Sequence, residues 1–314
     1  MAYIGQVIQK LRVNRKLSRN TLSNGICTEK YLYLIEKGQR TPSSEVSHLL
    51  SARLGVDLFQ YYEYLDCIEP IYVHDAINKL NAYRRTTNFS ESIVLIRELA
   101  LHPDFQKPPY SYELEVDKFG YKMFSKKEYV EVIEDIFSLI DSVDNKYSEE
   151  EFMANLYMLL STALQYSLRL GEAKQALNQA MSILENKEGI TRYHQVIYSS
   201  RLNRMTLAYL EGDYQEVIND GLWLNEFNIR TNSFERSDFT YYYIAMGYWG
   251  LGHEDEAMRW LEKCVFALLI HPNSNVVKII LSFGPFKEMI KNSDMCGKIR
   301  CKLKDIYPEL STIM

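Results

Sequence analysis

The sequence predicts an all-α protein, with a small helical domain first and a longer array of helical repeats behind it. Three observations predict this fold class. Glycine and proline number only 14 and 8 among 314 residues, apolar residues recur with helical spacing, and helix breaks return about every 40 residues. Few glycines and prolines favour long, uninterrupted helices. A chain of this length exceeds one ordinary core and fits two domains or a repeat array.

The net charge of −5 is unevenly distributed along the chain. Residues 1–53 carry nine lysines and arginines against three glutamates, about +6, so the remaining residues carry about −11. A basic head on an acidic body is the distribution that nucleic-acid binding by one end requires.

Several classes of protein are disfavoured by what the sequence lacks. The longest apolar run, residues 265–270, is far below the roughly 20 residues of a membrane helix. Residues 1–10 have no secretory apolar core, so a cytoplasmic protein without a membrane segment is expected. The five cysteines have no C-x-x-C spacing, which argues for reduced thiols. No nucleotide-binding, metalloprotease or hydrolase motif is present, so we expect no enzyme activity and no cofactor.

The first 66 residues carry the signals of five short helices. Apolar residues between 4 and 11 recur with helical spacing, and Ser18 precedes a second helix. Thr28 is a natural N-cap for a third helix, and Gly38 suits its left-handed C-terminal cap. A fourth helix and a linking helix from about residue 58 complete the set. The second and third helices, joined by a glycine-containing turn, form a helix-turn-helix.

The stretch LSRNTLSNGICTEKYLYLIEKGQRTPSSEVSHLLSARLGV, residues 17–56, resembles the lambda-repressor-like (Xre) DNA-binding domains. The likeness lies in its apolar positions, its turn, the I-E-x-G ending of the third helix, and the P-S and L-G-V segments that follow. It implies a five-helix domain over residues 1–66 whose third helix enters the major groove of DNA.

Residues of the third helix are therefore expected to read bases. Domains of this type place the first turn of that helix against base edges, which implies that Glu29, Lys30, Tyr31 and Tyr33 are the readers. Lys30 can bond guanine O6 and N7, and Glu29 can accept from cytosine N4. Leu34 stands where relatives often carry a long polar residue, and it either meets a thymine methyl or packs against a neighbouring helix.

The cations around the third helix are expected to bind the DNA backbone. Phosphate contacts set the register of a protein on DNA and make its affinity depend on salt. Within the domain, Leu32 and Ile35 are expected in the core and Glu36 in a structural bond. The expected phosphate contacts are Arg12, Arg15, Arg19, Lys37 and Arg40.

From about residue 70 to 273 the pattern changes to paired amphipathic helices. Corresponding positions in successive breaks are Phe89, Tyr129, Ala173, Tyr214 and Glu254. Their intervals of 40, 44, 41 and 40 residues are typical of a helical solenoid. The stretch YYYIAMGYWGLGHEDEAMRWLEKCVFA, residues 241–267, resembles a tetratricopeptide repeat, which implies a right-handed α-solenoid.

Packing positions of that repeat are occupied by small and aromatic residues. Ala245 and Ala257 allow paired helices to approach closely, and Tyr248 and Trp260 are expected in the core rather than in a ligand site. Stacked repeats produce an extended curved surface that can hold a peptide. Residues 274–314 keep no repeat register, and we interpret them as a terminal cap or a dimerisation segment.

Both parts together resemble the peptide-responsive quorum-sensing regulators of the Rgg, PlcR and PrgX (RRNPP) group of Gram-positive bacteria. The resemblance includes the F-Q-Y-Y-E run at 59–63. It implies a homodimer whose repeats bind a short signalling peptide and whose paired heads bind a palindromic operator in double-stranded DNA. Two heads about 34 Å apart would read half-sites one helical turn apart.

The same resemblance implies a peptide site. In these regulators an asparagine on the inner helix of a repeat bonds the peptide backbone, since an amide offers both donor and acceptor. Asn203 occupies that place, with Arg201 and Arg204 available to a peptide carboxylate. Tyr241 and Tyr242 are expected to add an aromatic wall, although one of the three tyrosines at 241–243 must face the core.

Three functions remain open from the sequence. The first is a transcription regulator gated by a peptide. In the second, the repeats of a DNA-binding regulator recruit a protein partner instead. The third is a tetratricopeptide scaffold or kinase-pathway inhibitor with a vestigial head, for which substitution of Lys30 or Arg19 by alanine would leave activity untouched. Salt-dependent, sequence-selective DNA binding excludes the third, and peptide binding separates the first from the second.

Overall fold

The computed structural model describes residues 3–86, 88–270, 305 and 308, and among them it contains helices and no strand. The predicted all-α class is confirmed. The interpretation of residues 274–314 as a cap or dimerisation segment falls almost wholly outside the described residues. The chain forms two compact units, Met1–Glu128 and Tyr129–Met314. The boundary between the head and the repeats near residues 66–70 stays a prediction.

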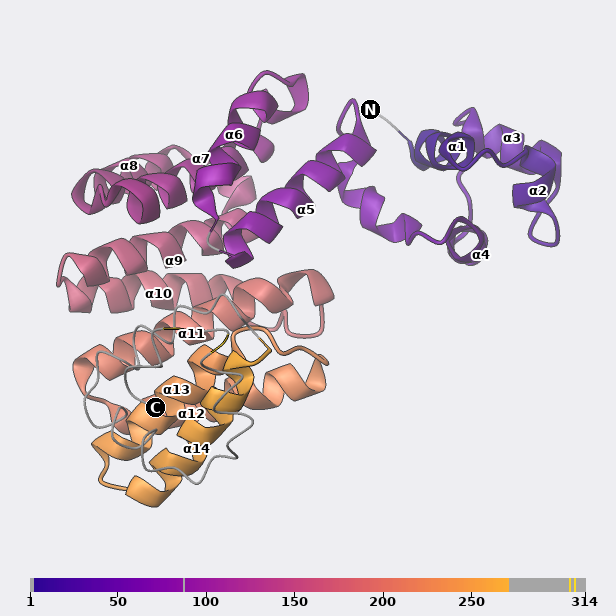
Figure 1. Cartoon of the computed structure of the whole chain (residues 1–314). Helices are drawn as coiled ribbons and strands as arrows, with labels where there is room; N and C mark the ends of the chain where they lie inside the picture. The colour runs from indigo at the N-terminus through magenta and orange to yellow at the C-terminus, as the bar shows by residue number, and fades with distance from the viewer. Residues whose placement is uncertain (1–2, 87, 271–304, 306–307, 309–314) are drawn as a thin grey trace. The chain divides into compact units, whose positions relative to one another are not determined.

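Five short helices build the head around one apolar core (Figure 1). Ser18 and Thr28 cap their helices as predicted, each accepting a hydrogen bond from a backbone N–H three residues on. The predicted linking helix from residue 58 is a 3₁₀ helix rather than an α-helix. The elements are α1 Ile4–Asn14, α2 Arg19–Ser23, α3 Glu29–Glu36, α4 Ser44–Leu54 and η1 Leu58–Tyr64.

A glycine allows α1 and α3 to meet at backbone contact. A Cβ added at Gly5 would lie 1.8 Å from the carbonyl oxygen of Ile35, so only glycine fits there. Gly38 ends α3 at φ +70°, the left-handed conformation predicted for it. The hydroxyl of Tyr3 donates to the carbonyl oxygen of Glu36 at 3.2 Å. These contacts fix α3 against α1.

The rest of the first unit is helical and has a second apolar core. Asp104 accepts hydrogen bonds from the backbone N–H groups of Ile68 and Glu69, just before α5 begins at Pro70. Arg84 of α5 donates to Asp117 of α7 at 2.7 Å and joins the two helices. The elements are α5 Pro70–Thr86, α6 Phe89–Leu99, η2 Pro103–Gln106, α7 Tyr110–Tyr121 and the π-helix η3 Lys122–Lys126.

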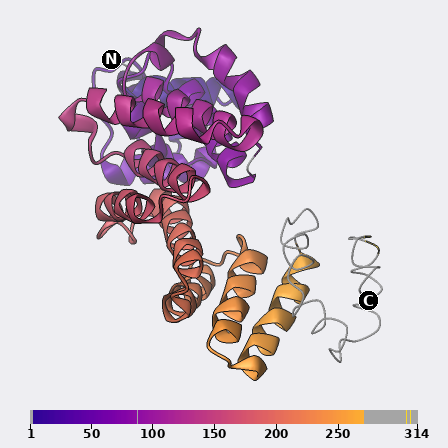
Figure 2. The same ribbon diagram turned by 90° about the vertical axis from the view of Figure 1, so that its left-hand side faces the viewer.

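The second unit continues the helix pairs (Figures 1 and 2). The predicted break positions are confirmed, because Phe89, Tyr129, Tyr214 and Glu254 are each the first residue of a helix and Ala173 lies in the first turn of α10. Its elements are α8 Tyr129–Ser142, η4 Asn145–Tyr147, α9 Glu151–Tyr166, α10 Leu170–Leu184, η5 Thr191–Tyr193, α11 His194–Glu211, α12 Tyr214–Arg230, α13 Ser237–Gly250 and α14 Glu254–Leu268.

Close packing in this unit depends on small residues. A Cβ at Gly221 would lie 2.3 Å from Ile244, so α12 and α13 approach more closely than any larger residue allows. Ala245 and Ala257 are fully buried, as predicted, whereas Tyr248 and Trp260 are only half-buried. The helix pairs of this unit are α9 with α10, α11 with α12, and α13 with α14. The first helix of the middle pair, α11, also packs against α9 and α13, the first helices of the pairs on either side. The first helices therefore form one continuous layer.

Candidate nucleic-acid interface and peptide-binding face

The exposed side of α3 carries most of the residues expected to read bases. Thr28 accepts a hydrogen bond from the N–H of Tyr31 at 3.1 Å and starts the helix there. Leu32 and Ile35 are completely buried in the head core, as predicted. Glu29, Lys30 and Tyr33 lie on the opposite, exposed side. Helical spacing thus separates a core side from an outward side.

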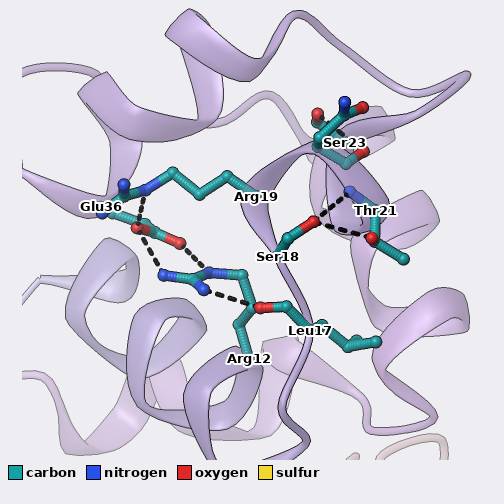
Figure 3. Close-up of polar contacts among 8 residues, drawn as sticks. Arg12, Leu17, Ser18, Arg19, Thr21, Ser23 and Glu36 are labelled. Carbon is teal, nitrogen blue, oxygen red and sulfur yellow. Dashed lines mark hydrogen bonds and ion pairs between the residues drawn. The ribbon is translucent and has the colours of Figure 1, made fainter.

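Glu36 makes the structural bond predicted for it, and it does so with two arginines (Figure 3). Its side chain is completely buried. Arg12 Nε lies 2.6 Å from Oε1, and Arg12 Nη2 lies 3.2 Å from Oε2. Arg19 Nε lies 2.6 Å from Oε2. A buried carboxylate is tolerated only when paired and hydrogen-bonded, and here it joins α1, α2 and α3.

The prediction that Arg12 contacts a phosphate is not supported by this geometry. Arg12 is only 8% exposed, and its remaining nitrogen, Nη1, donates to the carbonyl oxygen of Leu17 at 2.8 Å. All of its guanidinium nitrogens are therefore engaged inside the head. The sequence shows that residue 12 is an arginine, but it does not show that its partner is Glu36, 24 positions away. Arg15, Lys37 and Arg40 are exposed, and their phosphate contacts stay predictions.

Tyr33 lies close to two cations on the exposed face. The guanidinium carbon of Arg19 is 5.2 Å from its ring centroid, and Nζ of Lys37 is 5.9 Å away. The ring is 42% exposed. Cations over an aromatic face are attracted by its quadrupole, so the ring holds both cations beside α3.

Tyr31 is less free than its position in the sequence suggests. The side chain is half-buried and packs against the head core. Its hydroxyl donates to the carbonyl oxygen of Thr41 at 3.3 Å, which ties α3 to the loop before α4. A base contact from Tyr31 stays a prediction and would have to use the remaining lone pairs of the hydroxyl.

Asn203 lies in the layer of first helices, where the peptide contact was predicted. It is half-buried on α11, and its Nδ2 donates to Thr162 Oγ1 of α9 at 3.4 Å. The Thr162 hydroxyl donates in turn to the carbonyl oxygen of Met158 at 2.9 Å. Among the described residues this is the one side-chain bond of Asn203, and none of those residues bonds its amide oxygen.

Arg201 and Arg204 are held by an acidic residue that the sequence analysis missed. Asp220 of α12 is 1% exposed, and it accepts from Arg201 Nη1 at 3.1 Å and from Arg204 Nε at 2.6 Å. Arg201 also lies 4.5 Å from the ring centroid of Trp223. Both arginines therefore neutralise a buried charge, which weakens the attraction they can offer to a peptide carboxylate, and their contact with one stays a prediction.

Two of the three tyrosines at 241–243 lie in the core, whereas Tyr241 and Tyr242 were both predicted to contact the peptide. Tyr242 and Tyr243 are both buried, with 4% and 8% exposure, and their rings meet edge-on. Tyr241 is half-buried and lies 5.6 Å from Trp260 between ring centroids. Tyr242 therefore belongs to the core and not to an aromatic wall, whereas a ligand contact from Tyr241 stays a prediction.

A row of partly exposed, uncharged side chains along α9 and α11 was also missed. We call it the neutral stripe. Its members recur every three or four residues, which places each set on one side of its helix. The spacing can be found in the sequence, but the net negative charge of the residues after 53 gave no reason to look for an uncharged row. The neutral stripe consists of Asn155, Leu159, Thr162 and Tyr166 on α9 and of Gln195, Ser199, Asn203 and Thr206 on α11.

Other kinds of site were also sought in the described residues. No group of three histidine, cysteine, aspartate or glutamate side chains in that part of the chain could hold a metal ion. None of the described helices is both long enough and apolar enough to cross a membrane.

No protein-family model matches the sequence, and no curated protein matches it. Solved structures do. The chain is similar to Bacillus thuringiensis PlcR in complex with the peptide PapR7 and DNA, with a TM-score of 0.65 and 19% identity over 93% of this chain and 100% of that one. The apo form of PlcR gives a TM-score of 0.53 at 17% identity, over 85% of this chain and 93% of that one. ComR from S. thermophilus, in complex with DNA and its signalling peptide, gives a TM-score of 0.51 at 15% identity, over 86% of this chain and 94% of that one. These similarities establish the fold: a helix-turn-helix head followed by a tetratricopeptide-like helical domain.

Proposed function

We propose that this protein is a sequence-specific DNA-binding transcription regulator whose repeats bind a short signalling peptide. The observation that carries the proposal is the match over nearly the whole chain to a PlcR structure that contains both a peptide and DNA. The protein then acts in the cytoplasm by binding rather than by catalysis. Peptide binding alters the geometry of a homodimer or its affinity for DNA.

The DNA half of the proposal is supported by the basic head and by the exposed side of α3. Glu29 and Lys30 are available to base edges at the start of the helix. Arg15, Arg19, Lys37 and Arg40 supply the backbone contacts, and Arg19 is positioned for this by Glu36. Two heads of a homodimer would read a palindromic operator.

The peptide half is supported by the neutral stripe. Amide and hydroxyl side chains can bond to the backbone of an extended peptide from either side, as donor or acceptor. Asn203 lies in the middle of its row, with Ser199 and Thr206 one turn away on either side. We place the peptide along this face, with Asn203 as its central contact.

Two measurements on the full-length protein test the proposal. Selection from random duplexes identifies an operator, and calorimetry then measures binding of synthetic peptides taken from small secreted reading frames beside the gene. We expect one peptide to bind at micromolar or lower Kd and Asn203→Ala to lose that binding. Asn219→Ala, at an exposed position on the neighbouring α12, is the matched control and should bind normally.

Each negative outcome points elsewhere. Intact operator binding without any peptide binding would favour the alternative in which the repeats recruit a protein partner. Absence of sequence-selective DNA binding would contradict the regulator itself. Equal peptide affinity for Asn203→Ala and the unchanged protein would remove Asn203 from the site.

A further inference from the structure

Beside Tyr31, the outward side of the head is hollowed into a shallow depression. It is formed by α3, by the N-cap of that helix, and by the loop that leads to α4. The depression is lined by Thr28, Lys30, Tyr31, Leu34, Arg40 and Thr41. Leu34 is the one aliphatic side chain in this lining, and we call its exposed part the floor. We propose that Leu34 reads a thymine methyl group in each half of the operator. This inference rests on the proposed DNA-binding function.

The floor of the depression is apolar and held in place. Leu34 is half-buried, whereas Leu32 and Ile35 on the other side of α3 are completely buried. No neighbouring helix therefore covers Leu34 fully, and part of its side chain remains in contact with solvent. Tyr31 and Thr41 also line the depression, and the hydrogen bond from the Tyr31 hydroxyl to the carbonyl oxygen of Thr41 joins α3 to the loop there.

The chemistry of the floor selects one kind of base edge. In the major groove every base presents hydrogen-bonding atoms, and only thymine adds an apolar group, the C5 methyl. Leu34 can neither donate nor accept a hydrogen bond, so an amino or carbonyl edge placed on it would lose water without gaining a partner. A thymine methyl buries apolar surface there instead.

The charges at the rim favour DNA as the occupant. Lys30 and Arg40 are exposed at the edge of the depression, and neither forms an ion pair with an acidic residue in the described part of the chain. Two free cations beside an apolar floor are complementary to a base flanked by phosphates. Lys30 and Leu34 stand four positions apart, so they lie on the same side of α3 and meet neighbouring base pairs.

The test compares thymine with deoxyuridine, which differs only by the methyl group. In the selected operator each thymine is replaced in turn, and the affinity of the full-length protein is measured by fluorescence anisotropy at fixed salt. We expect a loss of about fourfold at one thymine in each half-site, the value for burying a single carbon group. Leu34→Ala should bind both operators equally.

Controls separate this inference from the general role of the head. Leu49→Ala, at an exposed leucine on α4, should keep the fourfold loss. Leu34→Gln is a second variant of similar length, and it should bind the thymine and uracil operators equally. The inference is wrong if no uracil substitution weakens binding, or if both folded Leu34 variants retain the loss. Failure to select any operator would instead contradict the proposed function.

Discussion

The Nε of Arg19 lies 2.6 Å from Oε2 of Glu36, although the two residues are 17 positions apart and belong to different helices of the head. The same carboxylate binds Arg12. The two arginines differ in how much of the side chain is exposed to solvent. The Arg12 side chain is 10% exposed, whereas the Arg19 side chain is 30% exposed and its guanidinium lies over Tyr33. One cation therefore stabilises the head, and the other is presented beside α3.

Arg12→Ala is predicted to act on stability. Removal of one partner from a buried ion pair costs about 3–5 kcal/mol, because the carboxylate of Glu36 loses half of its compensation. Urea unfolding of the full-length protein measures this loss. Arg15→Ala, an exposed neighbour, should unfold normally and reduce the salt dependence of DNA binding by about one counterion. If Arg12→Ala unfolded normally and instead reduced the salt dependence of DNA binding, Arg12 would be a phosphate contact.

Tyr33 is predicted to act through its ring. Tyr33→Ala should weaken binding of all duplexes alike by about 0.5–2 kcal/mol, because Arg19 and Lys37 lose their aromatic support. Tyr33→Phe keeps the ring and should bind as the unchanged protein does. Anisotropy on a panel of single-base operator variants measures both. A loss of preference at one base pair in Tyr33→Phe would mean instead that the hydroxyl reads a base.

Amidation of the peptide carboxylate is predicted to leave its affinity within about twofold. Arg201 and Arg204 are already paired with Asp220, which neutralises part of their charge, so a terminal carboxylate gains little from them. Asp220→Asn removes that charge, and only in this variant should the free carboxylate bind more tightly than the amide. Calorimetry with the two forms of one peptide measures the difference. A tenfold preference for the carboxylate in the unchanged protein would show that the arginines are free.

Alkaline pH is predicted to destabilise the second unit through Tyr198. Burial raises the pKa of Tyr198 to about 12, and its hydroxyl shares a 2.7 Å hydrogen bond with Thr240. The unfolded side chain loses its proton near pH 10, so the folded state binds more protons above that pH. This contribution is complete below pH 10 and is lost as pH rises to about 12, a change of roughly 2–3 kcal/mol.

Tyr198→Phe removes the titrating group and provides the comparison. Its unfolding free energy should fall less than that of the unchanged protein between about pH 9 and about pH 11.5. Parallel losses in the two proteins would mean that other groups carry the alkaline transition.

Features that depend on near neighbours in the sequence could be predicted. The caps at Ser18 and Thr28 require an N–H three residues on, and Gly38 requires only its own backbone conformation. Repeat spacing likewise located the second helix of each pair. The partners of charged residues could not be predicted in the same way, because Arg12 and Glu36 lie 24 positions apart and meet only when α1 and α3 pack.

The proposed peptide-binding face was harder to predict than the proposed DNA-binding face. A charge pattern identifies cations but not whether another helix neutralises them, and Asp220 stands 16 positions beyond Arg204. Helical spacing requires one of the tyrosines at 241–243 to face the core. Both Tyr242 and Tyr243 do so, because α13 packs against α12 and α14 together.

The most direct test of the account is the DNA affinity of the full-length protein with and without its peptide. Fluorescence anisotropy on the selected operator, repeated with saturating peptide, measures the coupling between the two sites. We expect a change of at least fivefold in operator affinity, in either direction, that Asn203→Ala abolishes and Asn219→Ala retains. Equal operator affinity with and without a bound peptide would contradict a peptide-gated regulator.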